Sequence, residues 1–257
     1  MRYISFDRIA EDYDRTRWIP SNLSDGFINR LSQEVPLGSR ILEIGVGTGR
    51  LAIPLSHLDY EVLGVDISML MLNIARQKTK KNEKILHLLQ ADATHLPIKE
   101  KTLDLCLFVH ILHLIRDWKK AIDIGERLLR NHSIVNASLF VAWHDLKPFR
   151  VYWDGIESKR SEHIGAKNAE EVIRYMKDSK GYLWKRYEFT RNAGTTSWKD
   201  AIGVIQEKSF SSQWRIPDDQ HQTALELVKE NETSFKRQIF QLEARCVIDL
   251  FKMAPND

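Results

Sequence analysis

Three acidic residues stand near the ends of three apolar runs, and a glycine-rich turn lies between the first two. Glu43 comes just before the turn, Asp66 closes the run EVLGV, and Asp92 closes the run ILHLLQA. A glycine-rich turn after an apolar strand lets the backbone approach a ligand closely. Carboxylates around it can accept hydrogen bonds from ribose hydroxyls and amino groups, and they would repel a pyrophosphate. This combination favours a pocket for a cationic nucleoside.

The spacing within the turn bears on the phosphate-binding alternatives. Gly45, Gly47 and Gly49 read Gly-x-Gly-x-Gly, followed by Arg50 and Leu51. The dinucleotide fingerprint needs a third glycine where Arg50 stands, and the P-loop needs Gly-Lys-Ser/Thr at its end. The sequence therefore weakens both phosphate-binding interpretations.

The elements that must position these residues alternate between strand and helix as far as residue 143. A helix is predicted at 24–35, the strands at 40–44, 61–65, 85–91, 104–109 and 136–143, and the intervening helices at 49–59, 69–81 and 117–131. Pro54 predicts that the helix at 49–59 bends or begins late. Continuous apolar strands that alternate with helices predict an α/β fold: a doubly wound, mostly parallel sheet with helices on both faces.

After residue 145 the alternation is weaker. Helices are predicted at 168–178, 196–208 and 219–238, and strands at 182–190 and 242–251, which would complete a seven-stranded sheet as an antiparallel pair. We expect one domain over residues 1–257, with a helical cover at 1–35, a cofactor-binding core at 36–145, and a lid and sheet completion at 146–257. The stretch 146–180 is expected to be an insertion over the site.

Composition excludes several other classes of protein. The 257 residues carry 38 basic and 35 acidic side chains, a net charge of +3 that does not favour nucleic acid as a partner. No apolar run approaches the ~20 residues of a membrane helix, and the first residues lack the apolar core of a secretory signal. We expect a cytoplasmic protein without membrane insertion.

Two local features have simple interpretations. Cys106 and Cys246 form no metal or disulfide pattern. The basic run 76–84 is interpreted as a solvated face.

These motifs together resemble the class I S-adenosylmethionine-dependent methyltransferases, in particular the small-molecule branch that includes the ubiquinone and menaquinone biosynthesis enzymes. The resemblance covers about residues 6–143. It rests on LEIGVGTG at 42–49, GVDIS at 64–68, QADA at 90–93 and the segment from Leu103 to Trp118, and the opening Phe6-Asp7, Tyr13-Asp14 and Arg17 is similar to that branch's N-terminal helix. One departure is LRNHS at 129–133, where the family usually has Lys-Pro-Gly-Gly.

The resemblance implies a Rossmann-like fold that binds S-adenosylmethionine and releases S-adenosylhomocysteine. It implies that the glycines approach the methionine portion, that Asp66 holds the ribose, and that Asp92 and Ala93 read the adenine. Tyr13 would close over the methionine end and Arg17 would meet its carboxylate. The full predicted cofactor set is Tyr13, Arg17, Glu43, Gly45, Val46, Gly47, Thr48, Gly49, Asp66, Ile67, Ser68, Asp92, Ala93, Phe108, Val109 and His110.

Methyl transfer is an in-line displacement, for which the protein supplies mainly position and electrostatics. A general base would help if the acceptor is a hydroxyl or an acidic carbon, and His110 and His113 follow the fourth strand, where one is needed. Either histidine can instead be a helix-start residue bonded to the backbone. The tryptophans outside the early α/β units, or at their edge, belong either to the core or to an acceptor pocket; they are Trp18, Trp143, Trp153, Trp184, Trp198 and Trp214.

Several alternatives stay open at this point. The fourth strand is not followed by Asn/Asp-Pro-Pro-Tyr/Phe, the turn with which similar enzymes grip a planar amino group. A small-molecule acceptor, methylated on O, N or C, is therefore preferred. A methyltransferase of RNA or protein, and a catalytically silent binding protein, are the alternatives. A nicotinamide-dependent oxidoreductase is disfavoured by Glu43 and Arg50. The sequence predicts neither the acceptor's identity nor the oligomeric state.

Overall fold

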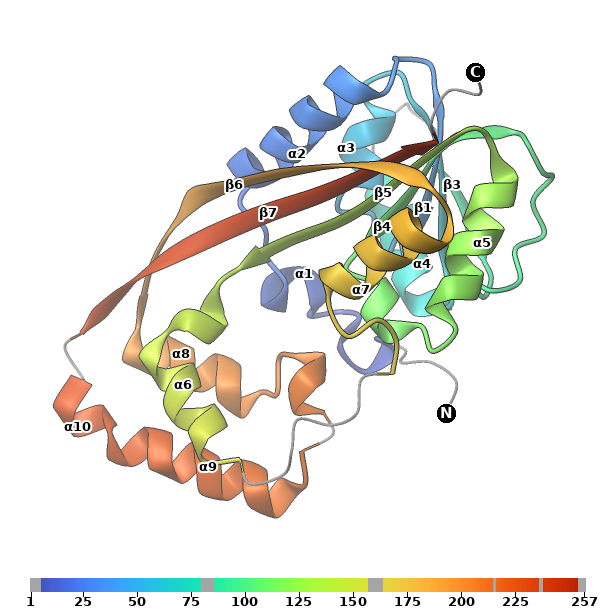
Figure 1. Cartoon of the computed structure of the whole chain (residues 1–257). Helices are drawn as coiled ribbons and strands as arrows, with labels where there is room; N and C mark the ends of the chain where they lie inside the picture. Colours follow the sequence, from blue (N-terminus) through green and yellow to red (C-terminus); the bar gives the residue numbers. More distant parts are fainter. Residues whose placement is uncertain (1–5, 80–85, 157–163, 215, 236–237, 254–257) are drawn as a thin grey trace.

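The computed structural model describes residues 6–79, 86–156, 164–214, 216–235 and 238–253. Within them, seven strands form one sheet in the order β3-β2-β1-β4-β5-β7-β6 (Figure 1). The strands are β1 (Arg40–Ile44), β2 (Glu61–Asp66), β3 (His87–Gln90), β4 (Leu103–Val109), β5 (Leu129–Val141), β6 (Tyr182–Ser197) and β7 (Ile239–Met253).

The order of the strands creates a switch point at the centre of the sheet. The chain runs outward from β1 to β2 and β3 and then crosses back to β4 on the other side of β1. Strands β1 to β5 pair in parallel, and β7 is antiparallel to both β5 and β6. Ligands of doubly wound sheets bind in the crevice that such a reversal opens at the carboxyl ends of the strands. The predicted doubly wound, mostly parallel seven-stranded sheet is confirmed.

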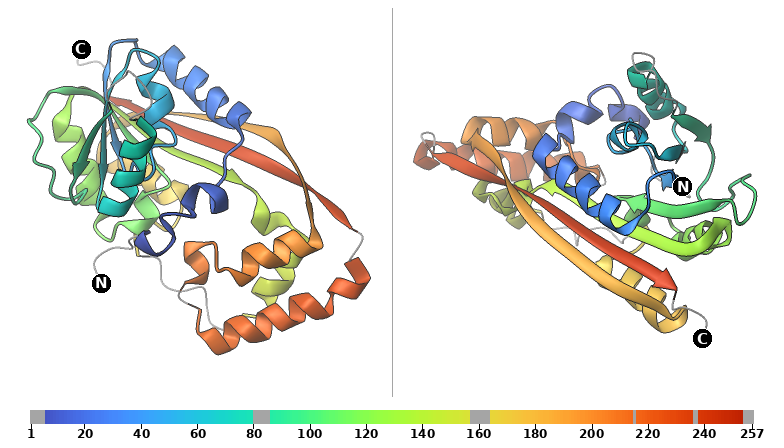
Figure 2. Two further views of the ribbon diagram at one scale, coloured as in Figure 1. Left: turned by 180° about the vertical axis from the view of Figure 1, so that it is seen from behind. Right: turned by 90° about the horizontal axis from the view of Figure 1, so that it is seen from above.

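Helices cover both faces of the sheet, as the views in Figure 2 show. On one face, apolar side chains of α2 (Ser21–Glu34), α3 (Ala52–Ser56) and α4 (Met69–Thr79) join the core. On the other face, α5 (Trp118–Leu128), α7 (Ala169–Arg174) and the π-helical turn η4 (Tyr175–Ser179) do so. The central strand β4 is buried along almost its whole length, because its sequence LDLCLFV is packed on both sides.

A group of helices lies beyond the far ends of β6 and β7 (Figure 1). The helical cluster, as we call it, consists of α6 (Lys147–Asp154), α8 (Trp198–Gln206), α9 (Asp218–Glu230), α10 (Glu232–Phe235) and the short turn η5 (Ser211–Gln213). The remaining short elements are η1 (Asp7–Ile9), α1 (Tyr13–Thr16), η2 (Leu112–Leu114) and η3 (Trp143–Asp145). No helix of the described residues is long and apolar enough to cross a membrane.

Several predicted boundaries differ from the structure. The helix predicted at 117–131 ends at Leu128, and β5 begins at Leu129 rather than at 136. The first residues of β5 are polar, but Arg130, at the amino end of the strand, is held by Asp104 of β4, with its Nε 2.9 Å from Oδ1. Strands β6 and β7 are longer than predicted because polar residues, including the bulge at 192–195, pair through the backbone.

Other boundaries were anticipated. Helix α3 starts late, at Ala52, so that Pro54 falls in its first turn, where a proline is tolerated. Four segments lie outside the described residues: 80–84 of the predicted basic run, Ile85 of the third predicted strand, 157–163 of the predicted insertion, and 236–237 of the last predicted helix. Within 146–180, α6 packs on α8 and α9 of the helical cluster, and α7 continues into η4. The predicted division into cover, core and lid stays a prediction.

Candidate active site

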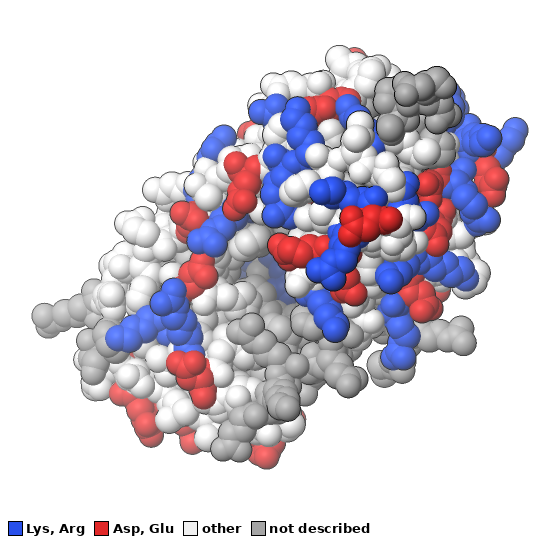
Figure 3. All heavy atoms as spheres, in the orientation of Figure 1, with Lys and Arg blue, Asp and Glu red and all other residues white. Residues whose placement is uncertain are grey.

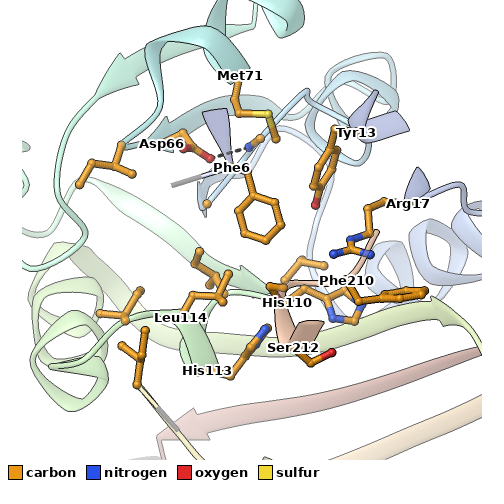
Figure 4. Close-up of a pocket in the computed structure, with 18 of the residues that line it drawn as sticks. Phe6, Tyr13, Arg17, Asp66, Met71, His110, His113, Leu114, Phe210 and Ser212 are labelled. Atoms are coloured by element: carbon orange, nitrogen blue, oxygen red, sulfur yellow. Dashed lines mark hydrogen bonds between the residues drawn. The ribbon is translucent and has the colours of Figure 1, made fainter. Parts of the chain in front are cut away.

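A cavity of about 930 Å³ lies at the switch point, where the carboxyl ends of β1, β2 and β4 meet (Figure 4). Three parts of the chain line it: the strand ends with the loops that follow them, the N-terminal segment 6–18, and the loops of the helical cluster. Its size lies at the upper end of the range for small-molecule sites, which is about 300–1,000 Å³.

The glycine-rich turn after β1 forms one wall. Gly45, Gly47 and Gly49 all have left-handed backbones, with φ of 76°, 55° and 78°. A Cβ at Gly45 would lie 2.6 Å from Cγ1 of Ile111, so the wall also has no room for a side chain at that position. Gly45 and Gly47 line the cavity, whereas Gly49 packs behind them against Ile53. The turn thus presents bare backbone to whatever the cavity holds.

Asp66 ties the end of β2 to this turn. Its Oδ2 accepts a hydrogen bond from the Gly47 N–H at 2.9 Å, and its Oδ1 accepts one from the Ser68 N–H at 2.9 Å. Burial raises the pKa of Asp66, which opposes these two hydrogen bonds and reflects how far the carboxylate is withdrawn from water. Each oxygen keeps a second lone pair, so the carboxylate can still accept from ligand hydroxyls.

The loop after β3 forms the next part of the wall. Asp92, Ala93, Thr94 and His95 all line the cavity. Oδ1 of Asp92 accepts from both the backbone N–H and the hydroxyl of Thr94, each at 2.8 Å. Because these contacts occupy Oδ1, Oδ2 is the oxygen of Asp92 better placed to meet a ligand amino group. Together with Asp66, this puts two carboxylates on one side of the cavity.

Glu43 lies beneath the glycine turn and is not among the residues that line the cavity. Its side chain is only 3% exposed, and Oε2 has no hydrogen-bond partner among the described residues. Burial raises the pKa of this carboxyl from its ordinary 4.5 to about 8, although the charge of Arg50 works in the opposite direction. A direct contact between Glu43 and a ligand stays a prediction.

The N-terminal segment covers the open side of the cavity. Figure 4 shows the Phe6 ring pointing into it, with Tyr13 and Arg17 alongside. Polar contacts hold the segment down: the Thr48 hydroxyl donates to Oδ1 of Asp14 at 2.6 Å, and the Ser68 hydroxyl donates to Asp7. The segment therefore closes over the turn rather than lying apart from it.

Two guanidinium groups meet beneath this cover. Arg50 donates to the Tyr13 hydroxyl at 3.3 Å and to the backbone carbonyl of Arg17. The Arg17 guanidinium carbon lies 4.6 Å from the ring centre of Phe210, and its Nη1 is buried without a hydrogen-bond partner among the described residues. Burial lowers the pKa of Arg17 to about 10. The pair can bind an anionic group.

The two predicted histidines lie in different environments. His110 has a φ of 52°, and its Nε2 lies 2.7 Å from the backbone nitrogen of Leu139, whose N–H can donate to it. Burial lowers the pKa of His110 to about 3, so the ring is neutral. His113 lines the same cavity with an exposed side chain (Figure 4). Geometry therefore makes His113 the more accessible of the two to a ligand.

The far end of the cavity is aromatic, and sequence reasoning located it only in part. Trp18, Trp143 and Trp153 line the cavity, whereas Trp198 is buried in the core and Trp184 lies on the sheet. Phe6 also lines it, although the sequence marked this residue only as part of the N-terminal segment. Met71, Phe140, Phe210 and Ser212 line it too, and nothing in their local sequence distinguishes them from core or surface residues. Of the predicted cofactor set, Glu43, Val46, Thr48, Gly49, Ser68 and Phe108 do not line the cavity, while the others do.

Comparison with known proteins shows which proteins this chain is similar to. A family model described as a methyltransferase domain matches residues 42–136. A demethylmenaquinone methyltransferase of Tropheryma whipplei is 32% identical over 129 residues, which cover 49% of this chain and 53% of that protein. The YqeM protein of Bacillus subtilis is 25% identical over 250 residues, 95% of this chain and 85% of that one.

A solved structure shows the same fold over most of the chain. The YcgJ protein of Bacillus subtilis superposes with a TM-score of 0.61 at 15% sequence identity, covering 91% of this chain and all of the other. The chain spans about half the length of the first curated relatives that it matches. The family match covers the glycine turn, Asp66 and Asp92, which line one end of the cavity. Over residues 42–136 in sequence, and over most of the chain in fold, the protein is similar to the class I S-adenosylmethionine-dependent methyltransferases.

Proposed function

We propose that this protein binds S-adenosylmethionine at the glycine turn and transfers its methyl group to a small-molecule acceptor held at the aromatic end of the cavity. The observation that carries the proposal is the pairing of a left-handed glycine turn with Asp66, whose two oxygens already anchor the turn and keep lone pairs for ribose hydroxyls. The cytoplasmic location and the small size of the acceptor, both expected from the sequence, stay predictions.

The residues present fit this cofactor. Ile111 fills the space that a Cβ at Gly45 would need. The turn therefore tolerates only glycine there, and its bare backbone is available to the methionine portion. Ile67, Met71 and Ala93 line the cavity near the two carboxylates and offer apolar contacts to an adenine ring. Tyr13, Arg17 and Arg50 stand at the opposite side, where Arg50, which donates to the Tyr13 hydroxyl, provides a cation for the carboxylate of the methionine portion.

Bound S-adenosylmethionine would supply a methyl group on a positively charged sulfur, and an acceptor atom placed in line with the carbon–sulfur bond would take the methyl carbon while the sulfur leaves as a neutral thioether. The chain's own contribution is to hold the acceptor in line and to exclude water. The Phe6 side chain and the aromatic end close the cavity on two sides. Alignment of this kind is worth about 7–11 kcal/mol of the barrier in favourable cases.

A proton must leave the acceptor if its nucleophilic atom is a hydroxyl or an acidic carbon. We propose that His113, which reaches the cavity, accepts this proton and that His110 positions the loop that carries His113. His110 is held by the backbone of β5, because its Nε2 lies 2.6 Å from the Leu139 carbonyl oxygen and 2.7 Å from the Leu139 backbone nitrogen. Its left-handed backbone turns the chain from β4 into the loop that carries His113.

A small acceptor also agrees with the charge distribution. Figure 3 shows that the basic and acidic side chains of the described residues are interspersed on the visible face and do not form a broad, purely basic surface there. The chain's net charge of +3 from 38 basic and 35 acidic residues points the same way.

The first test is isothermal titration of S-adenosylhomocysteine into the wild type, Asp66→Ala and a matched control, Glu226→Ala. Glu226 is an exposed acid of α9 outside the cavity. We expect binding to the wild type and to the control, and a loss of about 1–3 kcal/mol of binding free energy in Asp66→Ala, because a buried hydrogen-bond acceptor is removed. Absence of binding to the wild type would refute the proposal.

The acceptor class is tested separately, with S-adenosylmethionine labelled in its methyl group. The protein is incubated with cell extract, and the label is followed into small molecules, RNA and protein. Label in the small-molecule fraction supports the proposal. Label in RNA or protein contradicts it, and cofactor binding without any transfer points to a silent binding protein.

A further inference from the structure

The cavity extends past the glycine turn into an aromatic wall that the cofactor contacts leave unassigned. Four side chains form it: Trp143, His144, Trp153 and Phe210. The His144 ring lies 4.8 Å from the Phe210 ring centre and 6.1 Å from that of Trp153. The Trp153 indole N–H donates to Nδ1 of His144 at 3.2 Å, which fixes the two rings relative to each other. A wall of flat faces suits a planar apolar molecule.

Arg17 stands at the edge of this wall. Its guanidinium carbon lies 4.6 Å from the ring centre of Phe210, which comes from the helical cluster side of the cavity. Figure 4 shows the guanidinium between Tyr13 and Phe210, close to His110. Nη1 is buried, and no described residue accepts a hydrogen bond from it. A buried guanidinium donor without an acceptor is unfavourable, so this position favours a ligand that brings an anion.

The acids of the cavity lie elsewhere. The carboxylates that line it are Asp66, Asp92 and Asp117, which follow β2, follow β3 and precede α5. The described segments that form the aromatic wall contribute no carboxylate to the lining. An ammonium group at this end would face Arg17 without a counter-charge, whereas a carboxylate there would neutralise it.

Arg50 provides a second cation, closer in sequence to the turn. It follows Gly49 directly and donates to the Tyr13 hydroxyl at 3.3 Å. Two guanidiniums on one side of the cavity can serve two carboxylates, one on the amino acid end of the cofactor and one on the acceptor. Arg17, which stacks on Phe210, is the one directed toward the aromatic wall.

We propose that the acceptor is an aromatic carboxylate whose ring lies against Phe210, His144 and Trp143 and whose carboxylate pairs with Arg17. The proposal rests on the proposed function, since it names the acceptor class of the same site. It assigns Arg17 to the acceptor and Arg50 to the carboxylate of the cofactor. It also excludes aromatic and aliphatic amines, which would place a cation beside Arg17.

The test uses the protein saturated with S-adenosylhomocysteine and titrated with matched aromatic ligands. Each one- or two-ring carboxylate is compared with its neutral amide and with the corresponding amine, such as 4-hydroxybenzoate, 4-hydroxybenzamide and 4-hydroxybenzylamine. We expect the carboxylate to bind at least about tenfold more tightly than the amide, a difference of about 1.4 kcal/mol, and the amine to bind more weakly still. No preference for carboxylates across the panel overturns the proposal.

Variants show whether Arg17 is responsible for that preference. Arg17→Gln should abolish it, and Arg17→Lys should keep a part, since lysine retains the charge but not the two-pronged geometry. Arg150→Gln is the matched control, because Arg150 is an exposed residue of α6 outside the cavity. A preference that survives in Arg17→Gln contradicts the assignment.

One further comparison separates this proposal from the proposed function. Arg17→Gln is titrated with S-adenosylhomocysteine and with 5′-methylthioadenosine, which lacks the amino acid end. If only the first binds more weakly than to the wild type, Arg17 holds the carboxylate of the cofactor. The acceptor assignment is then wrong while the proposed function stands. If the wild type binds neither nucleoside, the proposed function itself fails.

Discussion

The carboxyl of Glu43 is the clearest residue-scale example of a group whose chemistry is set by its surroundings. It lies under the glycine turn with almost no exposed surface, and burial raises its pKa from 4.5 to about 8. The folded protein therefore keeps a proton on Glu43 over a range of pH in which the unfolded chain releases it. The stability that this proton confers is complete below about pH 4.5 and is lost as the pH rises toward 8.

Glu43→Gln should remove this dependence, because glutamine does not ionise. We expect the melting temperature of the variant, relative to the wild type, to increase as the pH is raised from 4.5 to about 8. Thermal unfolding followed by circular dichroism across that range measures the difference. Glu226→Gln, on an exposed site, should run parallel to the wild type at every pH. Parallel curves for Glu43→Gln would show that the buried carboxyl is not protonated as inferred.

Gly45→Ala tests whether the turn needs a glycine for more than its backbone angle. Gly45 and Gly38 both have left-handed φ, at 76° and 81°. An added Cβ at Gly45 would meet Ile111 at 2.6 Å, whereas at Gly38 it would meet nothing within 4 Å. Backbone strain of about 1–3 kcal/mol should appear in both variants. A further loss of stability, together with loss of S-adenosylhomocysteine binding, should appear only in Gly45→Ala.

The two variants are compared by chemical denaturation and by titration. Equal loss of stability in both would mean that Ile111 yields to the new methyl group. The sequence was most informative at the residue scale, because Gly45, Gly47, Asp66 and Asp92 are residue types that the proposed chemistry requires at those positions. The depth at which Glu43 lies could not be predicted, since burial depends on elements that fold over the turn.

At the scale of elements, the N-terminal cap of helix α8 helps to position the aromatic wall of the cavity. The Ser197 hydroxyl accepts a hydrogen bond from the Asp200 N–H at 3.1 Å, and the Asp200 carboxylate accepts one from the Ser197 N–H at 3.4 Å. The helix that follows buries Trp198, Ala201 and Ile205 against the core. Its end leads into the segment that carries Phe210 to the aromatic wall.

Ser197→Ala should destabilise the protein by about 0.5–2 kcal/mol, the usual effect of losing such a cap. S-adenosylhomocysteine affinity should stay unchanged, because α8 lies away from the glycine turn. Urea unfolding and titration measure the two effects. Ser32→Ala is the control, since Ser32 is an exposed serine within α2 whose hydroxyl only donates to the Asn29 carbonyl. A fall in cofactor affinity as large as the fall in stability would couple α8 to the cofactor end.

The predictions of elements succeeded where apolar patterns determine structure and failed where backbone pairing does. The parallel strands β1, β2 and β4 were predicted because they are continuous apolar runs buried in the sheet. The polar stretch RNAGTTS was not expected to continue β6, yet it pairs with the start of β7 across a bulge. Such pairing depends on a partner strand more than forty residues away, which no local pattern reveals.

At the scale of the whole molecule, the cavity exists only because three distant parts of the chain meet. The strand ends contribute the carboxylates, the segment 6–18 contributes Tyr13 and Arg17, and the helical cluster contributes Phe210. The sequence placed the first part, and through family resemblance the second. It could not show which tryptophans face the cavity, because that depends on how the helical cluster docks beside β6 and β7.

The N-terminal segment is attached to the rest by polar contacts and by the contacts of Phe6 with Trp214 and of Arg17 with Phe210. Among its described residues only Ala10 belongs to the buried apolar core, and Asp14 reaches the turn through Thr48 and Lys78. Exposed ion pairs contribute little to stability, about 0–1 kcal/mol each. Removal of residues 1–18 should therefore lower the melting temperature only slightly. It should weaken S-adenosylhomocysteine binding by at least about tenfold, equivalent to about 1.4 kcal/mol, because Tyr13, which accepts a hydrogen bond from Arg50, is lost and the cavity opens to water.

Circular dichroism and titration of the truncated protein measure both quantities. Arg15→Ala serves as the control, since Arg15 is exposed and its partners Asp12 and Glu207 do not line the cavity. It should match the wild type in both measurements. Retained affinity in a folded truncated protein would mean that the strand ends alone hold the cofactor. Loss of affinity without loss of fold would assign the segment to binding, as a cover that the sheet does not need for its own stability.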